Sequence, residues 1–194
     1  MEYIYYLIFI SYLSGSIPYG IIFTKFFGYE DIRKIGSGNI GATNVLRTAN
    51  KKIAFAVLIL DFLKCYLPVL IFSYFYDKNV GALCGLFSII GHIYPVWLSF
   101  KGGKGVACLF GFILALNHVF FIISLFIWLF TIFISKYSSL ASIISSITTV
   151  FLFFVYDNIV NDVIPLTIVI LILLKHGENI KRLIKRKENK VKLL

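Results

Sequence analysis

The sequence has 194 residues, of which 59% are hydrophobic and only 14% charged, and its mean hydropathy is +0.90. Soluble domains are about 45–50% apolar and about 25% charged, so this composition excludes an ordinary soluble protein and indicates one transmembrane domain over residues 1–194. The net charge of +10 would suggest nucleic acid in a soluble protein. In a membrane protein it reflects the enrichment of Lys and Arg in cytoplasmic loops, and we expect no nucleic-acid partner.

Seven apolar segments follow one another along the chain. They cover residues 3–24, 53–76, 80–99, 105–116, 119–135, 139–156 and 163–174. A transmembrane helix needs about 17–25 residues, and five segments reach that length, whereas the fourth and the seventh have only 12 residues each. The fourth and fifth segments could instead form one bent helix. The expected fold is an all-α integral membrane protein with seven transmembrane helices, two of them short.

The positions of the basic residues favour seven spans over six. With seven spans, 17 of the 19 Lys and Arg residues fall on one face of the membrane, while Lys78 lies opposite and Lys64 lies within a span. The positive-inside rule then predicts an external N-terminus and a cytoplasmic C-terminus. The basic tail from about residue 181 is expected to bind anionic lipid headgroups.

A polar, glycine-rich loop from Gly36 to Thr48 separates the first two segments. Glycines let backbone N–H groups turn toward an anion, and the forked guanidinium of Arg47 can bind two phosphate oxygens. Residues 36–41 formally match GxGxxG, but a membrane span precedes them where dinucleotide binding requires a strand. The loop therefore predicts phosphate binding, and a merely flexible loop is the alternative.

A second loop, Lys101-Gly-Gly-Lys104-Gly, precedes the fourth segment. It lacks the Ser or Thr and the glycine spacing of a P-loop, so it gives little support to ATP binding. Two lysines just before a helix N-terminus still favour an anion. An ordinary cytoplasmic loop is the alternative interpretation.

The second segment contains two charged residues, Asp61 and Lys64, three positions apart on one helix face. A charge at the bilayer centre costs about 2.5–3.5 kcal/mol on insertion scales, so we expect the two residues to form a structural ion pair. The three cysteines at positions 65, 84 and 108 lie in apolar stretches without metal-ligand spacing and are expected to be packing residues. No metal or other cofactor is expected.

Two histidines are candidates for a site. His176 lies at the predicted cytoplasmic edge, one helical turn before Asn179, and this pair could hold a hydroxyl and a phosphate oxygen. His92 lies in the third segment, where a hydrogen-bonded core histidine is the alternative. All the polar loops face the same side, which favours a lipid enzyme with a cytosolic site over a small transporter for a phosphorylated metabolite, because a transporter needs a through-path and often has inverted repeats.

The motifs together resemble the PlsY family of bacterial acyl-phosphate:glycerol-3-phosphate acyltransferases. The similarity runs nearly end to end and includes Gly15-Ser-Ile-Pro18, the loop 36–48, Asp61-Phe-Leu-Lys64, Gly91-His92 with Pro95, Phe100-Lys-Gly-Gly-Lys-Gly-Val-Ala107, Ser139-Leu-Ala-Ser142, and His176 with Glu178-Asn-Ile-Lys-Arg-Leu183. The two glycine-rich loops are highly specific in this order.

The resemblance implies a seven-helix enzyme of the bacterial inner membrane with its site on the cytoplasmic face. The sn-1 hydroxyl of glycerol 3-phosphate would attack the carbonyl of an acyl phosphate, without a cofactor, giving lysophosphatidic acid and phosphate. By motif position, the main ligands of the phosphate and glycerol groups are Ser37, Arg47, Lys104, Ser139, His176 and Asn179. Supporting pocket residues are Gly36, Gly38, Asn39, Thr43, Asn44, His92, Lys101, Gly102 and Gly103. Acyl phosphate, glycerol 3-phosphate and membrane lipids are the expected partners of a monomer.

An acyl phosphate is already activated, so the enzyme mainly has to position two anions that repel each other. We therefore expect a substrate phosphate oxygen to accept the hydroxyl proton. Three positions depart from the family pattern, because Cys65 stands where glycine is usual, Cys108 where threonine is usual and Gly177 where arginine is common. None of them is an expected ligand, so we expect activity.

Overall fold

A computed structural model describes residues 2–156 and 163–191. Lys192, a member of the predicted basic tail, lies outside the described residues. The helices are α1 (Glu2–Ser16), α2 (Tyr19–Phe26), α3 (Ala42–Thr48), α4 (Lys51–Phe75), α5 (Lys78–Ile93), the short 3₁₀ helix η1 (Val96–Leu98), α6 (Val106–Leu116), α7 (His118–Ser135), α8 (Ser138–Tyr156), α9 (Val163–Lys175) and α10 (Gly177–Ile184).

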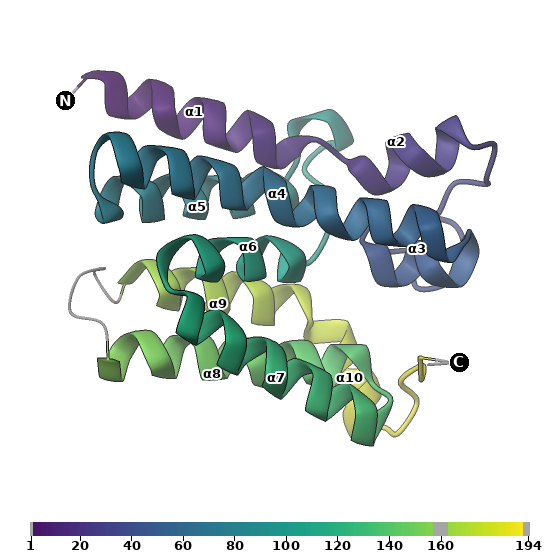
Figure 1. Cartoon of the computed structure of the whole chain (residues 1–194). Coiled ribbons are helices and arrows are strands. Elements are labelled where there is room, and N and C mark those ends of the chain that lie inside the picture. The colour runs from purple at the N-terminus through teal and green to yellow at the C-terminus, as the bar shows by residue number, and fades with distance from the viewer. Residues whose placement is uncertain (1, 157–162, 192–194) are drawn as a thin grey trace.

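Each of the seven predicted apolar segments corresponds to helix in the structure, the first one to α1 and α2 together. Successive segments run in opposite directions, so that α1, α5, α7 and α9 point one way and α4, α6 and α8 the other (Figure 1). The chain reverses direction at Asn117, between α6 and α7, where one bent helix was the alternative. Asn117 ends α6, and its side-chain oxygen accepts the backbone N–H groups of Val119 and Phe120 at the start of α7. An Asn in this role is a strong helix N-cap.

Five helical stretches are long and apolar enough to cross a membrane, namely 3–26, 51–75, 78–98, 118–135 and 138–156. The remaining two apolar helices are short, as predicted, with 11 residues in α6 and 13 in α9. Helix α9 is followed by α10 at a bend of 58°, and the pair passes the same test together. The protein is therefore a multi-pass membrane protein by composition and helix length.

The first span is broken near its middle, between Ser16 and Tyr19. Pro18 lies in the break, where its ring removes a backbone donor and prevents continuation of α1. The carbonyl of Ile17 would then lack a helical partner, and the Lys64 amine donates to it at 2.9 Å. The same amine lies 2.8 Å from Asp61, which confirms the predicted ion pair. Lys64 therefore also stabilises the break in the first span.

The main apolar core lies between α4, α5, α6, α7, α8 and α9. Its largest buried side chains include Phe112, Phe153 and Ile172. The three cysteines are unpaired and buried, and Cys65 and Cys108 belong to this core, so the prediction that they are packing residues is confirmed.

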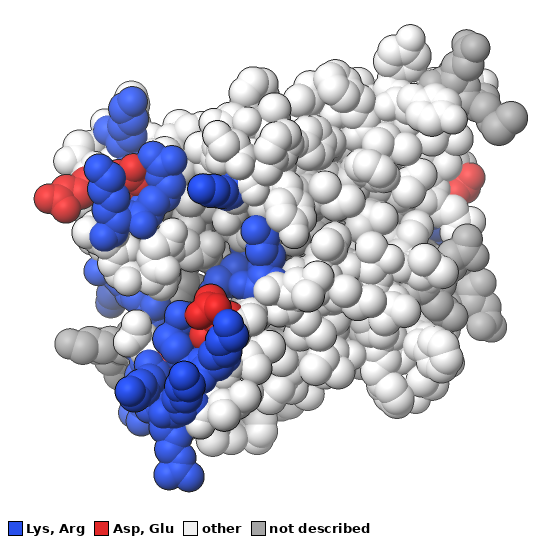
Figure 2. All heavy atoms as spheres, turned by 180° about the vertical axis from the view of Figure 1, so that it is seen from behind, with Lys and Arg blue, Asp and Glu red and all other residues white. Residues whose placement is uncertain are grey.

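Charge is concentrated at one end of the molecule. Figure 2 shows the Lys and Arg side chains in two groups with a hollow between them, while the rest of the visible surface is almost free of charge. Helices α2, α3 and α10 and the α7–α8 turn lie at this end (Figure 1). Because the basic residues come from distant parts of the sequence, the fold itself gathers them.

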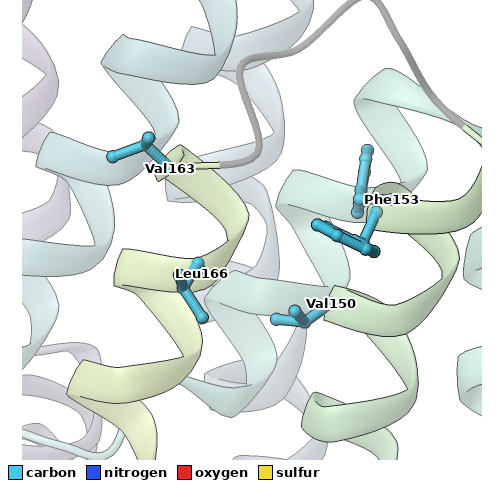
Figure 3. A pocket seen from close by; sticks show the side chains of 5 residues that line it. Val150, Phe153, Val163 and Leu166 are labelled. Atoms are coloured by element: carbon cyan, nitrogen blue, oxygen red, sulfur yellow. The ribbon is translucent and has the colours of Figure 1, made fainter.

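An apolar hollow lies in the other half of the molecule, between the end of α8 and the start of α9. It has a volume of about 260 Å³ and is lined by Val150, Phe153, Phe154, Val163 and Leu166 (Figure 3). Without a charged or hydrogen-bonding side chain in its lining, it is suited to hydrocarbon rather than to a phosphate. The site must therefore be sought at the charged end.

Candidate active site

The Lys-Gly-Gly-Lys loop is held against the end of α5 by backbone hydrogen bonds. A helix leaves its last carbonyls without helical partners, and here Gly102 N–H donates to Ile93 O at 3.1 Å and Gly103 N–H to His92 O at 3.0 Å. Gly105 follows in a left-handed conformation, with φ +84°, and caps the start of α6. The loop therefore fixes Lys104 between two helix ends.

Lys104 points toward the start of α10 and donates a hydrogen bond to Asn179 Oδ1. Burial lowers the pKa of the Lys104 amine to about 8; the charge of Glu188 opposes this shift, and the charges of Arg182 and Arg47 add to it. Side chains from the Lys-Gly-Gly-Lys loop, α10 and the tail therefore lie close together, and Arg47 of α3 is near enough for its charge to act on Lys104. A partly desolvated cation among these groups favours binding of an anion.

Glu188, in the C-terminal tail, accepts three hydrogen bonds at this place. The donors are Ser139 Oγ at 3.1 Å, Asn179 Nδ2 at 2.8 Å and Arg182 Nε at 2.8 Å. Its side chain is only 5% exposed. Burial alone would raise the pKa of Glu188, but the hydrogen bonds from Arg182 and Asn179 outweigh it and hold the pKa below its ordinary value. The carboxylate is therefore ionised at neutral pH and holds α8, α10 and the tail together.

His176 stands between α9 and α10 and is buried. Its Nδ1 lies 2.8 Å from Ile172 O, which fixes the ring. Burial lowers the pKa of His176 to about 4, and the charge of Lys104 acts in the same direction, so the ring is neutral at physiological pH. With the proton on Nδ1, toward the carbonyl, Nε2 is an acceptor.

The glycine-rich loop reaches the same end of the molecule through α3, a helix that the sequence analysis did not predict. Arg47, on α3, donates to the backbone carbonyl of Asn189 in the tail at 3.2 Å. Thr43 Oγ1 lies 3.5 Å from Ser138 Oγ at the start of α8. The loop thereby contacts both the tail and α8, at the edge of the group around Lys104.

Asn44 supports this loop from within. Its amide is buried and hydrogen-bonded to the loop backbone, since Nδ2 donates to Ile32 O at 2.8 Å and to Ile35 O at 3.2 Å, and Oδ1 accepts Ser37 N–H at 2.7 Å. Gly36 has φ +63°, and a β-carbon there would lie 2.3 Å from Asn44 Oδ1. The interpretation of Asn44 as a pocket residue is therefore revised, because its side chain shapes the loop and has no free polar group for a ligand.

The structure brings together only part of the predicted set. Lys104, Ser139, His176 and Asn179 meet, with Arg47 and Thr43 beside them. The side chains of Ser37, Asn39 and Lys101, and the glycines at 36 and 38, lie on the loops, with no hydrogen bond to the Lys104 group in the described part of the chain. His92 is buried beneath Gly102 and Gly103.

Arg182 and Glu188 were not predicted as site residues, because the tail was interpreted as a lipid anchor. Part of the tail is instead packed, because Val191 is buried among Ile132 and Ala141 and donates its N–H to Lys136 O at 2.8 Å. The only available signal was a single glutamate and a valine in a run of basic residues. Among the described residues, no three His, Cys, Asp or Glu side chains form a group that could hold a metal ion.

The chain is similar to known proteins over nearly its whole length. The family model described as "Glycerol-3-phosphate acyltransferase" matches residues 5–186. The chain belongs to the glycerol-3-phosphate acyltransferase family. Among its relatives, the glycerol-3-phosphate acyltransferase of Ehrlichia canis is 48% identical over 183 residues, covering 94% of this chain and 95% of that one. The family member from Pelagibacter ubique is 44% identical, with the same coverage.

Two solved structures of this acyltransferase family are also similar. Both are crystal structures of PlsY (YgiH), an integral membrane glycerol 3-phosphate acyltransferase. The glycerol 3-phosphate form has a TM-score of 0.93 and 38% identity, covering 97% of this chain and 96% of that chain. The lysophosphatidic acid form has a TM-score of 0.90 at the same identity, covering 97% and 95%. The fold is therefore that of the acyltransferase family over nearly the whole length.

Proposed function

We propose that this protein transfers a fatty acyl group from an acyl phosphate to the sn-1 hydroxyl of glycerol 3-phosphate. The observation that carries the proposal is the group of Lys104, Arg182, Asn179 and neutral His176, which offers cations and hydrogen-bonding groups at the charged end of a membrane protein. Both substrates are anions, and one has a hydrocarbon tail. An enzyme at the membrane surface can bind the anions and leave the tail in the bilayer.

In the proposed reaction, the sn-1 oxygen forms a bond to the acyl carbonyl carbon. The bond from this carbon to the phosphate oxygen breaks, inorganic phosphate leaves, and a phosphate oxygen accepts the hydroxyl proton. Lys104, with Arg47 and Arg182 nearby, reduces the repulsion between the two anions and stabilises the charge that develops on the leaving group. His176 Nε2, as an acceptor, orients the hydroxyl.

We further infer that the chain crosses a bacterial inner membrane seven times as a monomer, with the site in the cytoplasm. The concentration of Lys and Arg at one end supports this orientation. The alternating direction of the seven helical segments supports seven crossings. The short helices α6 and α9 can cross if their flanking residues extend the span or if the bilayer is thinner around them.

The deciding experiment is acyl transfer to labelled glycerol 3-phosphate by the purified protein in detergent. Palmitoyl phosphate and palmitoyl-CoA are offered separately, without metal or ATP. We expect lysophosphatidic acid from the acyl phosphate alone. Product from the CoA thioester alone would contradict the proposed donor, and no product from either, in folded protein, would favour transport of a phosphorylated metabolite.

The pH dependence of substrate binding should report the protonation of Lys104. We expect KM for glycerol 3-phosphate to be nearly constant up to about pH 7 and to about double by pH 8, where half of the amine has lost its proton. Above pH 8 it should rise toward about tenfold per pH unit. The substrate phosphate has a second pKa of about 6 and is a dianion throughout this range. The measurement is a series of initial rates between pH 6.5 and 9.5.

Unfolding does not account for such a rise. The pKa of Lys104 falls from its ordinary 10.5 to about 8 on folding, so the unfolded chain binds more protons between these values and the free energy of unfolding increases with pH in this window. A thermal-unfolding series at the same pH values provides the control. If a Lys104→Arg variant with activity showed the same rise in KM, another group would be responsible.

Replacing His176 by glutamine should reduce turnover by about 10²-fold, the loss that misorientation of a reacting group produces. Glutamine loses the hydrogen bond to Ile172 O that fixes the ring. The matched control is His118→Gln, because His118 is exposed at the start of α7, away from the Lys104 group. Full turnover in His176→Gln would remove this residue from the mechanism.

A further inference from the structure

The Asp61, Lys64 and His92 side chains form a buried polar group beneath the Lys-Gly-Gly-Lys loop. Asp61 Oδ1 lies 2.8 Å from Lys64 Nζ and 3.6 Å from His92 Nδ1, and each of the three residues is at most 5% exposed. The ion pair explains Lys64, which also binds the Ile17 carbonyl. It does not explain why a histidine should complete the group.

The other edge of the His92 ring faces Gly103. A β-carbon built on Gly103 would lie 2.1 Å from His92 Nε2 and 2.8 Å from its Cε1, so the imidazole occupies the space where a side chain would be. Gly103 also donates its N–H to the His92 carbonyl. The loop therefore rests on His92 through both the ring and the backbone, one residue before Lys104.

We propose that His92 is a positioning residue, which sets the position of Lys104 through its contact with Gly103. The inference rests on the proposed function, because it assigns Lys104 to the binding of substrate phosphate. Asp61 Oδ1 lies 3.6 Å from Nδ1, which has no hydrogen-bond partner in the described part of the structure. The opposite edge of the ring sets how closely Gly103 can approach α5, and the loop backbone then directs the Lys104 amine toward Asn179. Misplacement of a catalytic group by about 1 Å can lower a rate by about 10²-fold.

The two loop glycines provide a matched pair for the test. A β-carbon on Gly103 would meet only the His92 ring among its nearest atoms, whereas one on Gly102 would lie 2.2 Å from the His92 carbonyl oxygen and 2.4 Å from Pro95 Cδ. A shorter side chain at position 92 can therefore relieve the first clash but not the second. His92→Asn suits this purpose, because it keeps a polar group toward Asp61 and removes the ring edge that carries Nε2.

The experiment is a double-mutant cycle in the full-length protein with KM and kcat for glycerol 3-phosphate as readouts. We expect Gly103→Ala alone to raise KM by about tenfold or more, and His92→Asn alone to raise it less. The double variant Gly103→Ala/His92→Asn should recover about tenfold in kcat/KM relative to Gly103→Ala, a coupling within the range for contacting residues. Gly102→Ala should gain nothing from His92→Asn.

Additive effects in the cycle, or normal kinetics in Gly103→Ala, would overturn the proposal. Equal rescue of Gly102→Ala would also overturn it, since it would indicate general relaxation of the loop. If Gly103→Ala alone does not fold, a folded and active double variant supports the proposal, and an unfolded one contradicts it.

A binding readout separates this inference from the proposed reaction. Glycerol 3-phosphate should raise the unfolding temperature of the wild type and of the double variant, but raise that of Gly103→Ala less. If the wild type transfers no acyl group from any donor, the proposed reaction fails, and the pattern of these thermal shifts still decides whether His92 positions the anion-binding loop.

Discussion

Replacing Lys104 by glutamine should lower kcat/KM for acyl transfer by about 10²–10³-fold, the loss found when one preorganised donor to a developing negative charge is removed. The Lys104 amine is partly desolvated and lies among His176, Asn179, Arg182 and Glu188, so no solvent-exposed cation can replace it. The measurement is kcat and KM for both substrates at pH 7.

The comparison variant for Lys104 is Lys101→Gln in the same loop. Lys101 is exposed and makes only a backbone hydrogen bond in the described part of the structure, so we expect a loss of only a few fold, as for a screened surface charge. Equal losses in the two variants would show that the loop acts through its total charge rather than through the placement of Lys104.

Glu188→Gln should reduce both activity and stability. The substitution keeps the shape of the side chain but removes the negative charge that balances Arg182 and Lys104, and breaking a buried ion pair in this way costs about 3–5 kcal/mol at full burial. Arg182 is 38% exposed, so we expect a smaller loss of stability. We expect kcat/KM to fall by about 10²-fold. An amide nitrogen in place of Oε2 cannot accept from Arg182 Nε, and the hydrogen bonds of Ser139 and Asn179 to Oε1 lose their charged acceptor.

A shift of the pH profile distinguishes this effect from simple destabilisation. The charge of Glu188 raises the pKa of Lys104, so its removal should move the rise in KM to a pH below 8. The control is Glu178→Gln, because Glu178 lies on α10 as well but is exposed and pairs only with Lys181 at the surface. An unchanged pH profile in Glu188→Gln would show that the carboxylate does not act on Lys104.

The helical state of the seven apolar segments could be predicted because the information is local. A bilayer-spanning helix needs an uninterrupted apolar run, and such runs are visible without knowledge of neighbouring residues. Proline at position 18 and asparagine at position 117 likewise act on their own backbone. The ion pair between Asp61 and Lys64 was predictable for the same reason, since residues three apart share a helix face.

Only some residues of the candidate site could be predicted from the sequence. Lys104, His176 and Asn179 lie in motifs whose residue types suit an anion, and the structure brings them together. The roles of Asn44 and His92 could not be read from their motifs. Whether a polar side chain next to a loop faces a ligand or the protein's own backbone depends on conformation. The side chains of Asn44, on α3, and of His92, on α5, both face inward.

The C-terminal tail shows most clearly where the sequence is insufficient. By itself the sequence determined a multi-helix membrane protein with one basic end and two glycine-rich loops whose residue types suit an anion, because hydropathy and charge are additive along the chain. Only the tertiary structure decided that Glu188 accepts hydrogen bonds from Ser139, 49 positions away, and from Asn179. Such a contact depends on the chain turning back after α10. The burial of Val191 against α7 and α8 helps to hold that turn. A single valine in a run of lysines and arginines forms no periodic pattern, so the turn could not be predicted from the sequence.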